Sequence, residues 1–157
     1  MGNLLYREAT SADVPEMARI RSLRQGTEEG WQSRILAYMK GEHHPQEALP
    51  PRVLYVATDG GAIVGLIAGH LTQRFGCQGE LQWIDVVPER RGAGPSVELL
   101  RLLAAWFLER QARRVCVNVD PANVTARIFY IRNGAKDLNA HWLAWEDIGL
   151  TLGKTNM

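Results

Sequence analysis

A glycine-rich segment, residues 86–96 (VVPERRGAGPS), joins a predicted strand to a predicted helix and has the composition of an anion site. The first amides of a helix lack partners within the helix, and the helix dipole makes that end positive. Gly92 and Gly94 carry no Cβ that would keep a ligand away from the backbone. Arg90 and Arg91 add guanidinium groups that can pair with phosphate oxygens. The segment therefore predicts a phosphate site, with a pyrophosphate as the expected ligand.

The same spacing is also typical of an ordinary turn, because proline is favoured at the first position of a helix. The spacing alone leaves these two interpretations open. No Lys followed by Ser or Thr comes after the glycines, and the GxGxxG spacing of dinucleotide sites is absent. A nucleotide triphosphatase or a dehydrogenase is therefore disfavoured.

A second block, residues 123–130 (NVTARIFY), makes the pattern more specific. Together the two blocks resemble the GNAT superfamily of N-acetyltransferases. In the first block, the family's acyl-CoA pyrophosphate pattern is Arg or Gln, two residues, Gly, one residue, then Gly or Ala. Arg91, Gly94 and Ser96 take these three places. The second block, followed by residues 133–135 (NGA), resembles the family's N-x-x-A-x-x-F-Y segment with Gly-Ala or Gly-Phe behind it.

The resemblance implies that acetyl-CoA is the acyl donor and that its pyrophosphate binds across the glycine-rich segment. Backbone amides around Val86 and Val87 would hold the thioester carbonyl where two parallel strands splay apart. Asn123 is expected to cap a helix on account of its residue type, and the resemblance implies that it also helps to hold the CoA arm. The expected cofactor-binding residues are Val86, Val87, Arg90, Arg91, Gly92, Ala93, Gly94, Ser96 and Asn123.

Two residues of the first block depart from the family pattern. Ser96 replaces Gly or Ala but keeps the small size, and its hydroxyl could reach a phosphate oxygen or cap the helix locally. Pro95 replaces a residue that is usually aliphatic, and it removes one donor because proline has no N–H. A hydrogen bond to a charged group contributes about 1.5 to 3 kcal/mol, so Pro95 predicts cofactor binding weakened by about tenfold or more.

Acyl transfer to an amine requires a neutral nucleophile, a polarised carbonyl and a proton for the departing thiolate. The resemblance implies that the acid is Tyr130, whose phenol has an ordinary pKa of about 10 and can donate to sulfur. Without the motif, Tyr130 is simply a packed aromatic residue beside Phe129. The expected reaction is direct attack by the amine in a ternary complex. The alternatives are a GNAT-like sensor that binds acyl-CoA without turnover and, more weakly, a nucleotide binder.

The base that deprotonates the amine, often through water, is expected to be Glu80. Strict alternation along a strand places Glu80 on the same face as Ile84 and Val86. Asp85, the second candidate for the base, would then face the other way, together with Trp83. For Glu80 a solvent-facing charge at the end of a strand is the alternative interpretation.

Recognition of the acceptor is expected in the first two helices, where Glu28, Glu29 and Trp31 could meet a cationic amine. Solvated acids at the start of a helix are the favoured alternative. His43 and His44 have no third ligand at a recognisable spacing, so no metal site is expected.

The predicted elements give a mixed α/β (α+β) domain over residues 1–148, with a loose tail at residues 149–157. Strands are predicted at residues 4–7, 53–57, 62–68, 80–87, 115–119 and 140–146. Helices are predicted after residues 10, 27, 94 and 123, and a loop at residues 42–52. The resemblance implies a central, mostly antiparallel sheet with one splayed parallel pair, flanked by helices.

The composition agrees with one folded domain, since 46% of the 157 residues are hydrophobic. The formal net charge of +1 disfavours partners such as nucleic acid or a membrane surface. Cys77 and Cys116 lack metal-site or disulfide-framework spacing and are predicted to be buried free thiols. We expect a cytoplasmic protein whose partners are acetyl-CoA and an amine. Its tryptophans either belong to the core or form a surface for a homodimer.

Overall fold

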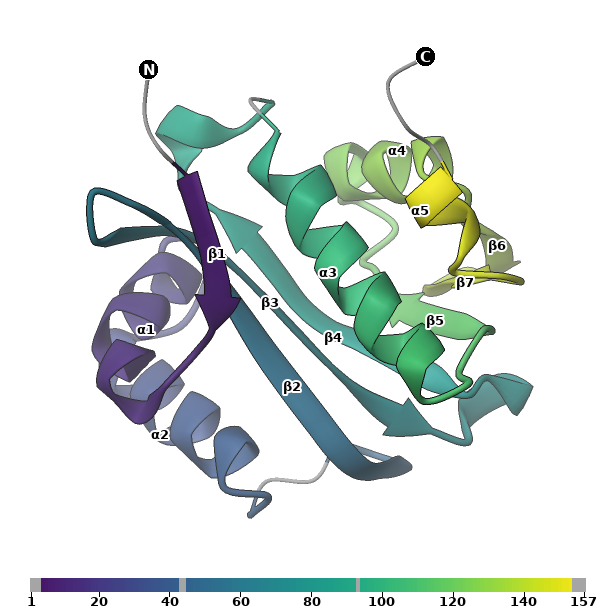
Figure 1. Cartoon of the computed structure of the whole chain (residues 1–157), viewed down its shortest axis with the longest axis horizontal. Coiled ribbons are helices and arrows are strands. Elements are labelled where there is room, and N and C mark those ends of the chain that lie inside the picture. Colours follow the sequence, from purple (N-terminus) through teal and green to yellow (C-terminus); the bar gives the residue numbers. More distant parts are fainter. Residues whose placement is uncertain (1–3, 43–44, 93, 154–157) are drawn as a thin grey trace.

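The computed structural model describes residues 4–42, 45–92 and 94–153, which form a seven-stranded sheet covered by helices (Figure 1). The strands are β1 (Leu4–Glu8), β2 (Ala48–Asp59), β3 (Ala62–Thr72), β4 (Gly79–Val86), β5 (Val115–Asn118), β6 (Lys136–Asn139) and β7 (Trp142–Trp145). Their order in the sheet is β1-β2-β3-β4-β5-β7-β6. Only β4 and β5 pair in parallel within this sheet, which confirms the predicted mixed α/β fold with one parallel pair.

The helices lie on both faces of the sheet. They are α1 (Val14–Ser22), α2 (Glu28–Met39), α3 (Pro95–Glu109), α4 (Val124–Arg132) and α5 (Leu150–Gly153). In Figure 1, α1 and α2 lie behind the sheet and α3 crosses in front of it. None of the described helices has the length and apolar character needed to cross a bilayer.

The starts of α1, α2 and α4 follow the predicted capping chemistry. The backbone N–H of Thr10 donates to Asp13 Oδ2 at 2.8 Å, and the N–H of Gly30 donates to the hydroxyl of Thr27 at 3.0 Å. The Asn123 side chain accepts a hydrogen bond from Ala126 N at 3.2 Å. Unpaired helix amides are thus satisfied at positions that the sequence predicted.

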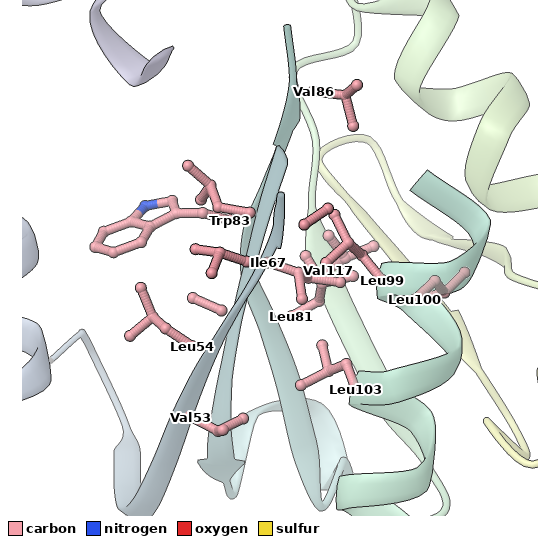
Figure 2. Packing of buried hydrophobic residues seen from close by; sticks show 14 of the residues in the cluster. Val53, Leu54, Ile67, Leu81, Trp83, Val86, Leu99, Leu100, Leu103 and Val117 are labelled. Atoms are coloured by element: carbon pink, nitrogen blue, oxygen red, sulfur yellow. The ribbon is translucent and has the colours of Figure 1, made fainter. Parts of the chain in front are cut away.

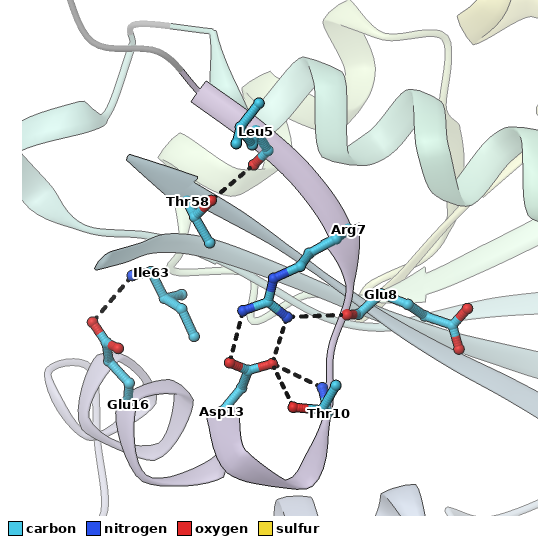
Figure 3. Close-up of polar contacts among 8 residues, drawn as sticks. All are labelled: Leu5, Arg7, Glu8, Thr10, Asp13, Glu16, Thr58 and Ile63. Carbon is cyan, nitrogen blue, oxygen red and sulfur yellow. Dashed lines mark hydrogen bonds and ion pairs between the residues drawn. The ribbon is translucent and has the colours of Figure 1, made fainter. Parts of the chain in front are cut away.

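A polar network ties α1 to the sheet (Figure 3). The Arg7 guanidinium on β1 donates to both carboxylate oxygens of Asp13, at 2.8 and 3.0 Å. One turn later, Glu16 accepts a hydrogen bond from the backbone N–H of Ile63 on β3 at 3.1 Å. These contacts hold α1 in place against the sheet, and α1 and the turn after it bring Arg21 and Arg24 into the site described below.

The core has two layers, one on each face of the sheet. Figure 2 shows Leu54 and Trp83 on one side and Leu81 and Leu103 on the other. The helix α3 packs so close to the sheet that a Cβ on Gly79 would collide with the ring of Phe107. Glycine in β4 therefore sets how near α3 can approach the sheet.

The structure corrects the predicted start of β2, adds the strand β6 and replaces part of the predicted tail by a helix. β2 begins at Ala48 instead of residue 53, because Ala48 and Leu49 pair with β3 and a register shift follows at the two prolines, which have no N–H to donate. β6 was not predicted, since a short polar edge strand has little hydrophobic pattern. The expected loose tail is wrong for residues 150–153, which form α5 with Thr151 buried and its hydroxyl donating to Ile148 O at 2.6 Å. Residues 154–157 of that predicted tail lie outside the described residues.

The two cysteines are free and buried, as predicted. They belong to a small cluster with Ala144 beside β5. Trp83, Trp106 and Trp145 are buried in the main core, and this agrees with the core interpretation of the tryptophans.

Candidate active site

The parallel strands β4 and β5 separate along their length. Their pairing runs from Gly79 opposite Val115 to Leu81 opposite Val117 and then ends, while β4 continues to Val86 beside β3. A gap therefore opens along one edge of β4, as the predicted splay requires. A cavity of about 1390 Å³ lies at this gap.

Two backbone amides of β4 point into the gap. The N–H of Val87 donates to Val64 O on β3 at 2.9 Å, so the alternation of an antiparallel ladder turns the amides of Val86 and Ile84 away from β3 and toward β5. The carbonyl of Val86 faces the same way and accepts a hydrogen bond from Arg91 Nε at 3.2 Å. The expected amide donor at Val86 is thus suitably placed. The amide of Val87 is not, because β3 already uses it.

A β-bulge at Gln82 decides which side chains face the cavity. Trp83 pairs with Ala68 and Leu81 with Gly69, which leaves Gln82 as an extra residue on β4. The bulge puts Trp83 and Leu81 on opposite faces of the sheet (Figure 2).

The expectation from strict alternation, that Asp85 faces away from Glu80, is therefore wrong. Asp85 contacts Arg21 of α1, and Glu80 lies beside His70, whose ring contacts Tyr38 of α2. Both carboxylates thus face α1 and α2. A lone Gln in an apolar strand gave no signal that the alternation would change there.

The turn after β4 leaves the start of α3 open to a ligand. Gly92 and Gly94 have φ angles of 81° and 108°, and a Cβ on either would have no neighbour within 4 Å. Among the described residues no side chain caps the helix at Gly94, and the first hydrogen bond within the helix runs from Glu98 N to Gly94 O. The amides of Ser96 and Val97 precede that bond and belong to residues that line the cavity.

Most of the predicted site residues meet at this cavity. Those that line it are Glu80, Val86, Arg91, Gly92, Ser96, Asn123 and Tyr130. Val87 and Gly94 do not line it, and Ala93 lies outside the described residues. Arg90 does not line it either, since its guanidinium forms an ion pair with Asp59 at the β2–β3 hairpin. The carboxylate of Asp59 would thus compete with a phosphate for the guanidinium of Arg90.

Tyr130 lies on α4 at the edge of the cavity and is almost fully buried. Its ring makes edge contacts with Phe129 and Trp145, at centroid distances of 5.6 and 5.8 Å. Burial raises the pKa of the Tyr130 phenol above its ordinary value, and the negative charge of Asp85 raises it further. The phenol therefore keeps its proton at neutral pH and is available as a donor.

Asp85 is fully engaged by two arginines of the α1 region. Arg21 Nη1 and Arg24 Nε each donate to one of its oxygens, both at 2.6 Å. The Asp85 side chain is 2% exposed and that of Arg21 is 12% exposed, so this is a buried ion pair. Desolvation lowers the pKa of Arg21, and Asp85 opposes that shift. Both carboxylate oxygens are occupied, which makes Asp85 a poor candidate for a base.

Glu80 is held more loosely. Arg74 Nε lies 3.4 Å and His70 Nε2 3.6 Å from Glu80 Oε1. His70 is completely buried, and its Nδ1 lies 2.9 Å from the hydroxyl of Tyr38. Tyr38, His70 and Glu80 thus form a chain of polar groups from α2 to the cavity. Neither His70 nor Tyr38 was predicted to belong to the site, although a histidine within an apolar strand is a usable signal.

Of the residues expected to bind the acceptor, only Trp31 lines the cavity. Glu28 and Glu29 are exposed and do not line the cavity, in line with solvated acids at a helix start. Trp31 lines the cavity, but the guanidinium carbons of Arg21 and Arg34 lie 4.4 and 4.9 Å from its ring centroid. Within the described residues no group of three or more His, Cys, Asp or Glu could hold a metal, and His43 and His44 lie outside these residues.

Comparison with solved structures shows close similarity in fold. An aminoglycoside N-acetyltransferase, AAC(6')-Iy, in complex with CoA has a TM-score of 0.74 at 14% identity, covering 88% of this chain and 91% of that one. A GNAT-family acetyltransferase from Staphylococcus aureus Mu50 has a TM-score of 0.73 at 13% identity, covering 91% and 98%. PaiA N-acetyltransferase from Thermoplasma acidophilum, in complex with coenzyme A, has a TM-score of 0.66 at 14% identity, covering 90% and 97%.

Comparison with curated protein sequences finds no match. A family model does match: residues 17–135, well over half of the chain, fit the acetyltransferase (GNAT) family. The matched range contains both sequence blocks and the strand gap between β4 and β5. The chain therefore belongs to the GNAT family of N-acetyltransferases.

Proposed function

We propose that the protein transfers an acetyl group from acetyl-CoA to a primary amine by direct attack in a ternary complex. The observation that carries this proposal is the free edge of β4, where the amides of Ile84 and Val86 face a gap that ends beside Tyr130. Donors for a carbonyl and for a leaving group thus line one cavity. Two of the similar structures contain coenzyme A, which agrees with this donor.

The residues present fit an acyl-CoA. Gln82 Oε1 is buried without a hydrogen-bond partner, and the amides of Ile84 and Val86 add donors along the same edge, so polar groups are available for a ligand that carries amides itself. At the far end, the amides of Ser96 and Val97 and the guanidinium of Arg91 suit the pyrophosphate. Bound acetyl-CoA would supply an activated acyl group.

Each protein group then has one task in the transfer. The amides of β4 stabilise negative charge on the carbonyl oxygen while the amine nitrogen forms the new C–N bond. As the C–S bond breaks, the hydroxyl of Tyr130 donates its proton to the sulfur. Glu80 accepts the amine proton, and this transfer runs through water because Glu80 lies four residues before Ile84, on the order of 10 Å along the strand.

The substitution Tyr130→Phe tests this assignment. It removes only the hydroxyl, so we expect kcat to fall by about 10² to 10⁴, as for the loss of general acid catalysis, with unchanged affinity for CoA. Release of free thiol measures turnover, and titration calorimetry measures CoA binding. Tyr55→Phe on β2, outside the cavity, is the matched control and should leave both quantities unchanged. Full activity of Tyr130→Phe would remove Tyr130 from the mechanism.

One observation favours a second candidate, an acyl-CoA sensor without turnover. Pro95 occupies the first turn of α3 and cannot donate to a phosphate. The two functions are separated by a broad panel of amines: if none releases free CoA although acetyl-CoA binds, the sensor is the better description. Competition of ATP against acetyl-CoA tests the weaker hypothesis of a nucleotide binder.

A further inference from the structure

The acceptor side of the cavity carries more positive than negative charge. The side chains that line it between β4 and the α1–α2 region include four arginines, Arg21, Arg24, Arg34 and Arg74, and two carboxylates, Glu80 and Asp85. Arg91 belongs to the pyrophosphate end, and Asp120 and Arg132 belong to the loop and helix after β5. A substrate with several ammonium groups would therefore meet a surplus of like charge.

The two carboxylates are already used by three of these arginines. Asp85 accepts from Arg21 and Arg24, and Glu80 pairs with Arg74. Among the described residues, no carboxylate lies within ion-pair distance of Arg34. Arg34 is exposed and rests on the ring of Trp31, 4.9 Å from its centroid. This contact with the ring leaves the N–H donors of the guanidinium free of any carboxylate of the described residues and open to a ligand.

Arg24 also has unused donors. It donates to Asp85 through Nε, and the described residues provide no partner for its two terminal nitrogens. Its side chain is 45% exposed, so these nitrogens can be reached from the cavity. Arg21 and Arg24 line the same cavity as Tyr130, so this cluster and the reacting end share one space. A ligand with its amine near Tyr130 can thus present an anionic group to Arg24.

A second, smaller cavity provides space beyond the two arginines. It has a volume of about 450 Å³ and is lined by Gln25, Gly26, Thr27, Gly30, Trp31 and Arg34. Gln25, Trp31 and Arg34 also line the main cavity, so the two spaces adjoin. A side chain on the acceptor could extend from the main cavity along Trp31 into this space.

We propose that the acceptor is a small amine that also carries a carboxylate, the chemical class of the free amino acids, with Arg24 and Arg34 holding the carboxylate. This inference rests on the proposed acetyl transfer and names its substrate class. A carboxylate near the amine neutralises the surplus charge and accepts hydrogen bonds from both guanidinium edges. Polyamines lack this group, and so does the N-terminal residue of a peptide, whose carboxyl group forms the peptide bond.

The test compares acceptors that differ only at the carboxylate. Phenylalanine, phenylalaninamide and phenethylamine share the amine and the ring, and spermidine and a C-terminally amidated tripeptide without charged side chains represent the other classes. We expect kcat/KM for the amino acid to exceed the other four by about 10- to 100-fold, the effect of one hydrogen bond to a charged group. The amide is the stringent comparison, because its amine is less basic and would react faster if proton loss alone decided the rate.

Variants of the wild-type chain then localise the effect. Arg34→Gln should remove most of the preference for the amino acid over its amide. Arg19→Gln is the matched control, since Arg19 is exposed on α1 and does not line either cavity. An equal preference in wild type and Arg34→Gln, or a preferred amide, polyamine or tripeptide, would overturn the inference.

A binding measurement separates this inference from the proposed function. Calorimetry on the protein saturated with CoA requires no turnover and should show tighter binding of phenylalanine than of phenylalaninamide, lost in Arg34→Gln. That result without any acetyl transfer supports the carboxylate site and contradicts the enzyme activity. Equal or undetectable binding of both ligands contradicts the carboxylate site, whether or not another amine is acetylated.

Discussion

Replacing Asp85 by Asn should destabilise the protein strongly, because it leaves a buried guanidinium without its counterion. Asp85 makes two hydrogen bonds of 2.6 Å, to Arg21 and Arg24. The bond to Arg21 is buried and contributes about 1.5 to 3 kcal/mol as a charge-assisted hydrogen bond. Arg24 is about half exposed, so its share is closer to that of a surface pair, at most about 1 kcal/mol. We therefore expect the free energy of unfolding to fall by about 3 kcal/mol.

Urea unfolding followed by tryptophan fluorescence measures this loss. Asp137→Asn is the matched control, because Asp137 also pairs with an arginine but is 65% exposed, and it should cost less than about 1 kcal/mol. Adding Arg21→Met to Asp85→Asn should restore part of the stability, since the unpaired buried charge is then removed. Equal losses in Asp85→Asn and Asp137→Asn would refute the reasoning that this ion pair anchors α1 to β4.

Three further outcomes are expected. Gly79→Ala should lower the unfolding free energy by about 1 to 3 kcal/mol in urea titrations, because its Cβ would collide with Phe107; an unchanged midpoint would mean that α3 moves freely away from the sheet. Arg7 lowers the pKa of Asp13, so the stabilisation from this pair is complete above the ordinary pKa of Asp, about 3.9, and is lost as the pH falls through the lower folded-state value. The difference in stability between wild type and Asp13→Asn should therefore shrink between pH 7 and pH 2, and a constant difference would contradict the ion pair. Pro95→Ala restores one helix amide and should tighten CoA binding by about tenfold in calorimetry, whereas weaker binding would show that the proline shape matters more than the donor.

Local chemistry made much of the fold predictable. Helix starts at Thr10, Thr27 and Asn123 follow from side chains that satisfy free amides, and the hairpin at residues 59–61 follows from glycines that adopt positive φ. The mostly antiparallel sheet with one splayed parallel pair came from the resemblance to a family, and the order of the strands was not predicted, because pairing between distant strands leaves little trace in local sequence. The register of strand pairing and the β-bulges depend on tertiary packing and were the least predictable features of the fold.

The candidate site was predictable where residue type alone decides the role. Gly92 and Gly94 have the open backbone that was predicted for the anion turn, whereas the role of Tyr130 was taken from the resemblance to the family. Arg90 and Val87 were predicted by proximity in sequence, and each has a competing partner that only the folded chain reveals. Arg34 was not singled out, because nothing in the sequence indicates that its helix would bring it to the cavity that Arg24 also lines.

The extra residue at position 82 reverses, for the rest of β4, which side chains face each side of the sheet. Before it, even-numbered side chains face α1 and α2; after it, odd-numbered ones do. Glu80 and Asp85 therefore share a face although their positions, 80 and 85, differ by an odd number. Deleting Gln82 would rotate either end of the strand by half a turn and send one of the two carboxylates into the layer under α3. The length of this strand is therefore as strictly constrained as the identity of the residues on it, and a one-residue gap here in a related sequence would mark a differently built site.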